Sequence, residues 1–320
     1  MGLLKYILRR LFTIFVSIVV VIIITYVLMW LAPGEFFNIA QFQASAGKVA
    51  TLTPEQLQIL IKGFEEKYGL NVPLWKQVWN YLKDAFRFKF GPSFSNPNEP
   101  IEVQIARRFP VTFTLAILAM ALAVIVGIPL GVLAALRRNT WVDYITMFFS
   151  MIGSIIPAYL IGVIMVIIFS VYLRLLPTSG WETPKQMIMP VITVALGPMA
   201  IIARFTRSSL LDVLNQDYIR TAYAKGGTDR AVIMRHALRN SLLPVVTVIG
   251  PQLAFLFTGT VWIENLFRVP GLGQLFVNAA SMRDYPLLVT STFILSLSVM
   301  LMNLLVDIIY AFLDPRIKYQ

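Results

Sequence analysis

Residues 109–136 read FPVTFTLAILAMALAVIVGIPLGVLAAL, a stretch without a single Asp, Glu, Lys or Arg. About 20 helical residues cross the roughly 30 Å hydrocarbon core of a bilayer, so this stretch is long enough to span one. Only helices and closed barrels satisfy their own backbone polar groups in lipid, and an apolar run of this length is typical of a helix. The stretch therefore predicts a membrane-spanning helix.

The same pattern recurs along the chain, in six uncharged runs that are long enough, or nearly so, to be spans. Apolar residues make up 58% of the sequence and charged residues only 13%, whereas a soluble domain carries about a quarter charged residues. The mean hydropathy is +0.74. We therefore expect an all-α integral membrane protein with six transmembrane helices. The runs cover residues 11–34, 109–136, 144–173, 186–203, 240–263 and 285–306, the last continuing past Asp307 to 313.

Composition changes near residues 35 and 109 divide the chain into three parts. Residues 1–34 are expected to hold a cytoplasmic tip and a first transmembrane helix, which is too long for the apolar part of a signal peptide. Residues 35–108 are too polar for lipid and predict an extracytoplasmic helical region. Residues 109–313 predict a membrane core with a cytoplasmic loop at 204–239. Its spans are expected at about 111–136, 144–173, 186–206, 241–263 and 286–313.

The net charge of +11 would suggest nucleic acid as a ligand in a soluble protein, but in a membrane protein it serves orientation. With the N-terminus in the cytoplasm, 14 Lys and Arg residues near the spans lie inside and at most six lie outside. The excess of positive charge on the cytoplasmic side predicts that both termini are cytoplasmic. We expect the lipid bilayer, and no nucleic acid, as a partner.

Helix signals mark the extracytoplasmic region. Thr53, Pro54 and Gln56 form a helix start, and Gly69 can end that helix, which predicts a helix over residues 54–68. A second helix is expected from Pro73, with one apolar face that packs on the outer ends of the spans or lies at the lipid interface, direct substrate contact being the alternative. That face comprises Trp75, Val78, Trp79, Leu82 and Phe86.

The chain lacks an energy source of its own. Ion-coupled carriers usually hold ionisable groups in mid-membrane, but only Asp307, near a cytoplasmic end, interrupts the predicted spans. A phosphate-binding loop would end in Gly-Lys-Ser/Thr, whereas the Gly47–Lys48 pair precedes Val49. The chain has no Cys and one His, so we expect neither catalytic nor metal-binding residues. The alternatives are a subunit driven by a partner's ATP, an ATP-independent channel or secondary carrier, and a structural subunit of an energy-transducing complex.

The loop at residues 204–239 is the expected contact with such a partner. Asp217 can cap a short helix over residues 218–225, which Gly226 and Gly227 can end in a left-handed turn. A second helix over residues 231–238 leads into the next span. A short helix held between two others suits a docking protein, and it could equally lie flat on anionic lipid.

At this loop the sequence resembles the permease subunits of oligopeptide/dipeptide-type ABC importers of prokaryotes. The resemblance continues at residues 31–34, 52–56, 91–95, 127–131, 270–273 and 284–286, so it covers nearly the whole chain. Within the loop it rests on Tyr218, Arg220, Thr221, Ala222, Ala224, Lys225 and Gly226, followed by Arg235, His236, Ala237, Leu238, Arg239, Asn240 and Pro244.

This resemblance implies the core fold of a type I importer in a prokaryotic plasma membrane. It implies transport of oligopeptides or dipeptides into the cytoplasm by alternating access, with nickel chelates or oligosaccharides as alternative substrates. The implied partners are a second homologous permease, two ATP-binding subunits and an extracytoplasmic substrate-binding protein. ATP and Mg²⁺ would be bound in the partner subunits, and no cofactor in this chain.

The resemblance also assigns site residues. Tyr218, Arg220, Thr221, Ala222, Ala224, Lys225 and Gly226 would form the coupling helix that docks on an ATPase subunit. Glu264, Pro270, Gly271 and Gly273 would belong to the outer gate or dock the binding protein. A peptide pathway also needs small polar groups, for which Ser150, Ser154 and Thr193 are the candidates.

Overall fold

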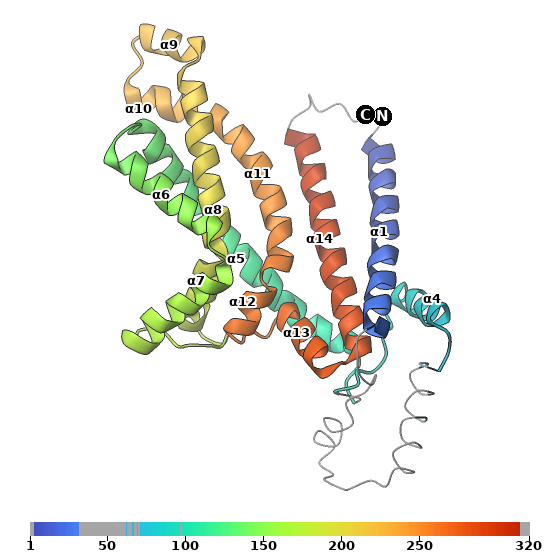
Figure 1. Ribbon diagram of the computed structural model, residues 1–320. Coiled ribbons are helices and arrows are strands. Elements are labelled where there is room, and N and C mark those ends of the chain that lie inside the picture. The colour runs from blue at the N-terminus through green and yellow to red at the C-terminus, as the bar shows by residue number, and fades with distance from the viewer. Residues whose placement is uncertain are drawn as a thin grey trace. The chain divides into compact units, whose positions relative to one another are not determined.

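The computed structural model describes residues 3–31, 62, 66, 69, 71–96 and 98–313, and these are mainly helical (Figure 1). The chain forms two compact units. The first, unit 1, contains residues up to 110 and residues 275–298, and unit 2 contains residues 111–274 and the chain from 299 onward. Residues 275–298 thus belong with the N-terminal part, whereas the composition changes in the sequence lie near residues 35 and 109.

Unit 1 contains α1 (Leu3–Leu31), α4 (Leu74–Ala85), the start of α5 (Ile101–Leu136), most of α13 (Leu272–Met282) and the first half of α14 (Tyr285–Leu313). Helix α4 packs on α1 through aromatic pairs. The ring centroids of Tyr26 and Tyr81 lie 5.9 Å apart, and those of Phe15 and Phe86 lie 5.7 Å apart. The Tyr81 hydroxyl also donates a hydrogen bond to Thr290 on α14 at 3.2 Å.

Asp284 fastens the loop before α5 to the start of α14. Its carboxylate accepts hydrogen bonds from the Ser95 amide at 2.8 Å, from the Ser95 hydroxyl at 2.6 Å and from the Ser93 hydroxyl. It also accepts the Leu287 amide at 3.2 Å, as a residue capping a helix N-terminus does. Asp284 and Ser93 are fully buried, so two segments that the resemblance quoted separately form one hydrogen-bonded anchor.

Helix α4 begins directly after Pro73, as the sequence predicts, and the residues of its predicted apolar face differ in burial. Val78 and Ala85 are buried, whereas Trp75, Trp79 and Phe86 are 65–70% exposed. The three rings are exposed although Phe86 also contacts Phe15 on α1. Among the described residues, no neighbouring helix of unit 1 covers them, and the prediction that this face packs on the spans or lies at the lipid interface stays a prediction. The other predicted helix, over residues 54–68, lies outside the described residues apart from single positions.

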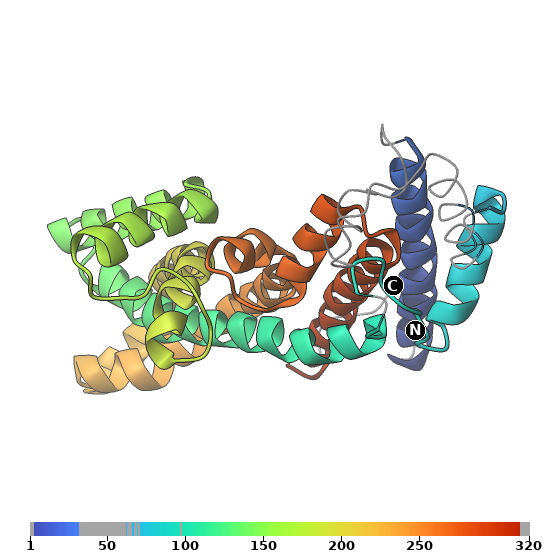
Figure 2. The same ribbon diagram turned by 90° about the horizontal axis from the view of Figure 1, so that it is seen from below.

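Unit 2 contains the rest of α5, the helices up to the start of α13 and the second half of α14. Helix α8 (Pro184–Leu214) packs mainly against α6 (Trp141–Ile155), α7 (Ala158–Met165) and α11 (Leu238–Gly259), besides α5. Figure 2 looks nearly along α8 and α11. Helix α8 continues eight residues past its predicted end at 206, so part of the predicted loop is a continuation of the span. The remaining elements are η1 (Val166–Tyr172), α9 (Asp217–Ala224), α10 (Asp229–Val232), η2 (Ile233–Ala237) and α12 (Val261–Leu266).

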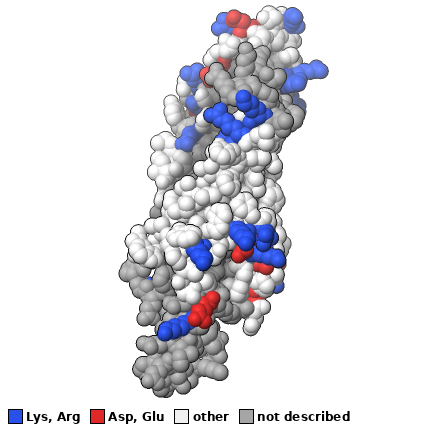
Figure 3. Space-filling view, turned by 90° about the vertical axis from the view of Figure 1, so that its right-hand side faces the viewer, with Lys and Arg blue, Asp and Glu red and all other residues white. Residues whose placement is uncertain are grey.

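Among the described residues, five helices are long and apolar enough to cross a membrane. They are Lys5–Leu31, Ile101–Leu136, Pro184–Leu214, Asp229–Gly259 and Tyr285–Ile309. A bent pair, Trp141–Ile155 and Ala158–Tyr172, would make a sixth crossing, and its two helices meet at 106°. On the face drawn in Figure 3, a stretch of surface without charged side chains separates two groups of Lys and Arg side chains.

The span predicted over residues 144–173 is bent, and Pro157 explains the bend. Ile156 is extended, with φ −74° and ψ 127°, because the ring of a following proline disfavours helical backbone. Pro157 also lacks the amide hydrogen that would continue the helix. Helices α6 and α7 therefore diverge sharply at this point (Figure 1).

Two glycines let α5 approach α8 closely. A Cβ at Gly127 would lie 2.9 Å from the carbonyl oxygen of Met199, and a Cβ at Gly131 would come closer still to that of Ala203. Helices in membranes associate largely through such close van der Waals packing. Any side chain at Gly131 must therefore push the two helices apart.

We expect Gly131→Ala to lower the stability of the chain, because overpacking of a close contact costs about 1–3 kcal/mol. The measurement is the thermal unfolding midpoint of the purified chain in detergent. Gly197→Ala is the matched control, since a Cβ there meets nothing nearer than a carbonyl oxygen at 3.8 Å. Equal midpoints for Gly131→Ala and the wild type would contradict the packing argument.

Candidate functional site

The short helix α9 (Asp217–Ala224) lies between the end of α8 and α10, where the sequence predicts a docking helix. Its N-cap is Gln216, so Asp217 is the first helical residue and the expectation that Asp217 caps the helix is wrong. Its negative charge still favours the helix N-terminus through the helix dipole. Arg220 forms an ion pair with Asp217 at 3.6 Å, and both side chains are so exposed that the pair adds little stability.

A glycine turn ends α9, as the sequence predicts. The Gly227 amide donates to the Ala222 carbonyl at 3.2 Å and the Gly226 amide to the Tyr223 carbonyl at 2.9 Å, which is the hydrogen-bond pattern of a Schellman motif. Gly226 has φ +84° and open space where a Cβ would lie, so it is needed for its backbone conformation. Gly227 is needed for space, since a Cβ there would lie 2.9 Å from the Ala222 carbonyl oxygen.

The inner face of α9 is anchored in an apolar cluster. Ile219 is 1% exposed and packs with buried residues of α5, α8, α10 and η2, and Ala222 lies half-buried against the same cluster. A force applied to α9 therefore passes to helices α5 and α8 through side-chain packing. The buried members of the cluster are Ala135, Leu210, Ile219, Val232 and Ala237.

The outer face of α9 is free to meet a partner. Of the residues that the resemblance assigns to docking, Ala222 faces the cluster of its own unit, and the others are exposed. The exposed ones are Tyr218, Arg220, Thr221, Ala224, Lys225 and Gly226. A short, exposed helix on a rigid, packed base can transmit movement, and this is the arrangement a mechanical coupling requires.

Glu264 on α12 is fully buried and holds the start of α13. Its Oε2 atom accepts hydrogen bonds from the amides of Gly273 at 2.7 Å and Gln274 at 3.2 Å. The Thr112 hydroxyl accepts the Leu272 amide at 2.8 Å, so three first-turn amides of α13 have partners. Burial raises the pKa of the Glu264 carboxyl above its ordinary value, and the hydrogen bonds that the carboxyl forms offset only part of this rise.

The glycines next to Glu264 are required by the same contact. A Cβ at Gly271 would collide with the Glu264 carboxyl and the Thr112 hydroxyl, and one at Gly273 would collide with the backbone of Val261. Of the four residues assigned to the outer gate or to binding-protein docking, Pro270 alone is exposed. Glu264, Gly271 and Gly273 thus shape the turn that presents Pro270.

The candidate pathway residues have different surroundings. Ser150 and Thr193 are buried within unit 2, and the Thr193 hydroxyl donates to the Met189 carbonyl at 2.7 Å, a common way for Thr to satisfy its hydroxyl in an apolar helix. Ser154 is exposed and accepts a hydrogen bond from Arg204 at 2.9 Å. Only Ser154 of the three therefore lies on a surface of this chain.

An ion pair between α6 and α8 was not predicted. Arg207 Nε lies 2.6 Å from Asp143 Oδ1, and its Nη2 lies 2.7 Å from Oδ2, a bidentate geometry. The Asp143 side chain is 3% exposed and also accepts the Asn139 amide at 3.1 Å. The sequence signal is an isolated acid beside the positively charged turn at Arg137 and Arg138. Arg207 follows the predicted end of its span at 206, so the sequence places it in a loop.

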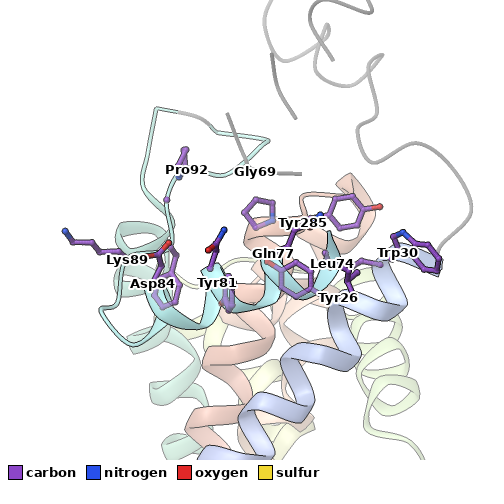
Figure 4. Close-up of a pocket in the computed structure, with 15 residues that line it drawn as sticks. Tyr26, Trp30, Gly69, Leu74, Gln77, Tyr81, Asp84, Lys89, Pro92 and Tyr285 are labelled. Atoms are coloured by element: carbon purple, nitrogen blue, oxygen red, sulfur yellow. The ribbon is translucent and has the colours of Figure 1, made fainter. Parts of the chain in front are cut away.

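Unit 1 contains a cavity of about 410 Å³ (Figure 4). Aromatic side chains of α1, α4 and α14 line it together with polar and charged side chains of α4 and the following loop. Among the described residues, no group of three His, Cys, Asp or Glu side chains could hold a metal ion. The lining includes Tyr26, Trp30, Tyr81, Phe90 and Tyr285, and Gln77, Asn80, Asp84 and Lys89.

Two family models match the sequence. Residues 127–319 match the binding-protein-dependent transport system inner membrane component, and residues 3–116 match the N-terminal part of membrane components of such systems. The chain is 42% identical to the dipeptide transport system permease protein of Bacillus subtilis, over 98% of both chains. It is 40% identical to the oligopeptide transport system permease protein of Haemophilus influenzae, over 99% of this chain and 100% of that one.

A solved structure of the MetNI methionine ABC transporter in an inward-facing conformation has a similar fold. The TM-score is 0.55 at 19% identity, and the match covers 68% of this chain and 99% of that chain. At this identity the likeness concerns the fold alone. The predicted permease fold is confirmed by this match and by the family match together.

Removal of one partner of the Asp143–Arg207 pair should destabilise unit 2. Asp143→Asn leaves the half-buried guanidinium without its counter-charge, and we expect a loss toward the lower end of the roughly 3–5 kcal/mol typical of broken buried pairs. Thermal unfolding of the purified chain measures it. Asp217→Asn removes the exposed pair with Arg220 and serves as the control, which should unfold like the wild type. If both variants unfold alike, the buried pair does not stabilise the fold.

The Glu264 anchor yields a separate expectation. Glu264→Ala leaves the amides of Gly273 and Gln274 buried without a partner, which costs about 1–3 kcal/mol, whereas Glu264→Gln keeps an acceptor oxygen and should lose less. Unfolding midpoints of both variants test the order, and Asn265→Ala, an exposed neighbour on α12, is the control. A larger loss in Glu264→Gln than in Glu264→Ala would refute the capping role.

Proposed function

Because the chain belongs to the family of binding-protein-dependent transport system inner membrane components, we propose that it is a permease subunit of an ATP-driven importer that moves oligopeptides or dipeptides into the cytoplasm. The observation that carries the proposal is similarity over the whole chain to permeases named for dipeptide and oligopeptide transport. The exposed helix α9 on its packed base supplies the mechanical part that such a subunit needs.

The proposed complex contains this chain, a second homologous permease, two ATP-binding subunits and an extracytoplasmic substrate-binding protein. Exposed apolar side chains on α6 and α11 support further membrane contacts, with lipid or with the second permease. Phe149 is 64% exposed, Phe255 64% and Leu243 56%. Lys and Arg are concentrated near α9, which supports a cytoplasmic position for that helix and for both termini of the chain.

In the proposed mechanism this chain makes and breaks no covalent bonds. ATP and Mg²⁺ would be bound by the partner subunits, whose movement displaces α9. Ile219 and Ala222 transmit that displacement to α5 and α8 because they are packed against both. The spans then alternate between outward-facing and inward-facing arrangements, and peptide passes from the binding protein to the cytoplasm.

The proposal is tested by isolating the chain with its partners from the native membrane and reconstituting the complex in vesicles. ATP hydrolysis should rise when the binding protein carries peptide, and peptide should accumulate inside only with ATP. Isolation of the chain without ATP-binding subunits, together with peptide flux that needs no ATP, would refute the proposal and favour a channel or secondary carrier.

Gly226→Val tests the role of the turn after α9. A valine is strained in a backbone with φ +84°, although no neighbouring atom would clash with its Cβ. We expect the turn to shift α9 on its docking surface, so that the complex assembles and hydrolyses ATP but peptide uptake falls at least tenfold. Gly226→Asn is the control, because Asn adopts this conformation more readily, and it should retain most of the uptake. Wild-type uptake in the valine variant would show that the turn is not needed for coupling.

A further inference from the structure

A second cavity, of about 500 Å³, lies in unit 2 where α9 meets the start of α11. Figure 1 shows the helices α9, α10 and α11 that follow one another in this part of the chain. The cavity is bounded by one residue of α9, two of η2 and three of α11. They are Tyr218, Arg235, His236, Arg239, Asn240 and Leu243.

The lining of this cavity is basic and contains no acidic side chain. Arg235, His236 and Arg239 are all exposed. Within the part of the chain that the structure describes, neither arginine forms an ion pair, in contrast to Arg220 on α9, which is paired with Asp217. The positive charge of the cavity is therefore available to an external anion.

The backbone builds this arrangement from a π-helical turn. The turn η2 (Ile233–Ala237) joins α10 to α11, and such turns often occur at functional sites. Ala237 is buried in the cluster beneath α9, while Arg235 and His236 remain on the outside. The side-chain amide (Nδ2) of Asn240 donates a hydrogen bond to the Tyr218 hydroxyl at 3.0 Å, which links α9 to α11 at the edge of the cavity.

The position of the cavity favours a lipid over a soluble anion. Leu243 follows Arg239 by one helical turn and is 56% exposed, within the helix that is long and apolar enough to span the membrane. Basic side chains next to an exposed apolar side chain can bind a molecule that carries an anionic head group and an acyl chain. Arginine binds phosphate oxygens through two parallel hydrogen bonds, which suits a phosphodiester head group.

We propose that this cavity binds the phosphate group of an anionic phospholipid, with Arg235, His236 and Arg239 around the phosphate and Leu243 beside the acyl chain. In the proposed orientation the lipid belongs to the cytoplasmic leaflet. The lipid would brace the base of α9, because Tyr218 and Asn240 take part in both the cavity and the link between α9 and α11. Lipid binding concerns the isolated chain, so it stands or falls independently of the proposed transport function.

The test measures lipid bound to the purified full-length chain in detergent by native mass spectrometry. Phosphatidylglycerol and phosphatidylcholine are titrated separately, with the wild type and with Arg235→Gln/Arg239→Gln. Each basic residue near an anionic lipid contributes about a fivefold change in affinity, so the double variant should bind phosphatidylglycerol at least tenfold more weakly. Arg230→Gln, which alters an exposed arginine of the same loop outside the cavity, is the matched control and should bind like the wild type.

Asn240→Asp is a second variant that keeps the shape of the cavity. It places a carboxylate in the lining that can still hydrogen-bond to Tyr218, so phosphatidylglycerol binding should fall while the unfolding midpoint stays unchanged. Equal binding by the wild type and the double variant, or equal affinity for the two lipids, would overturn the proposal. Displacement of the lipid by millimolar inorganic phosphate would assign the cavity to a soluble anion. Loss of bound lipid when ATP-binding subunits are added would assign it to a protein contact.

Discussion

The close approach of α5 to α8 at Gly127 and Gly131 is the constraint on which much of unit 2 depends. In lipid there is little hydrophobic gain from bringing two apolar helices together, so association relies on close packing and polar contacts. The two glycines allow the close packing, and the Asp143–Arg207 ion pair is a polar contact that holds α6 on α8. Helix α8 thereby becomes the common support of α5, α6, α7 and α11.

The same helix carries α9, which we propose docks on an ATP-binding subunit. Because α8 continues to Leu214, the connection to α9 is only two residues long, and Ile219 inserts into a cluster formed partly by α5 and α8. The docking helix is thus anchored to the spans by packing as well as by the chain. Because of this packing, a displacement of α9 should also displace α5 and α8, as the proposed mechanism requires.

Turns in this protein use glycine for two different physical reasons. At Gly226 the backbone has positive φ and free space, so the conformation selects glycine. At Gly271 and Gly273 the backbone lies against Glu264, Thr112 and Val261, so space selects glycine. The sequence shows glycine in each turn but not the reason, because the neighbours that exclude a Cβ come from distant segments. The sequence likewise does not show that Glu264 is buried and that its carboxylate accepts hydrogen bonds from the first amides of α13.

Local composition was enough to predict the class of the protein, the approximate places of the apolar helices, and the short helix before Gly226. Long uncharged runs admit one structure in lipid, and helix ends have local signals. Long-range packing was needed to establish which residues of α4 are buried and which residues meet at Asp143, Glu264 and Asp284. Each of these depends on contacts between segments far apart in the chain, which no local pattern encodes. The break at Pro157 is the intermediate case, because the proline is visible in the sequence but a proline within a span can be tolerated without a bend of 106°.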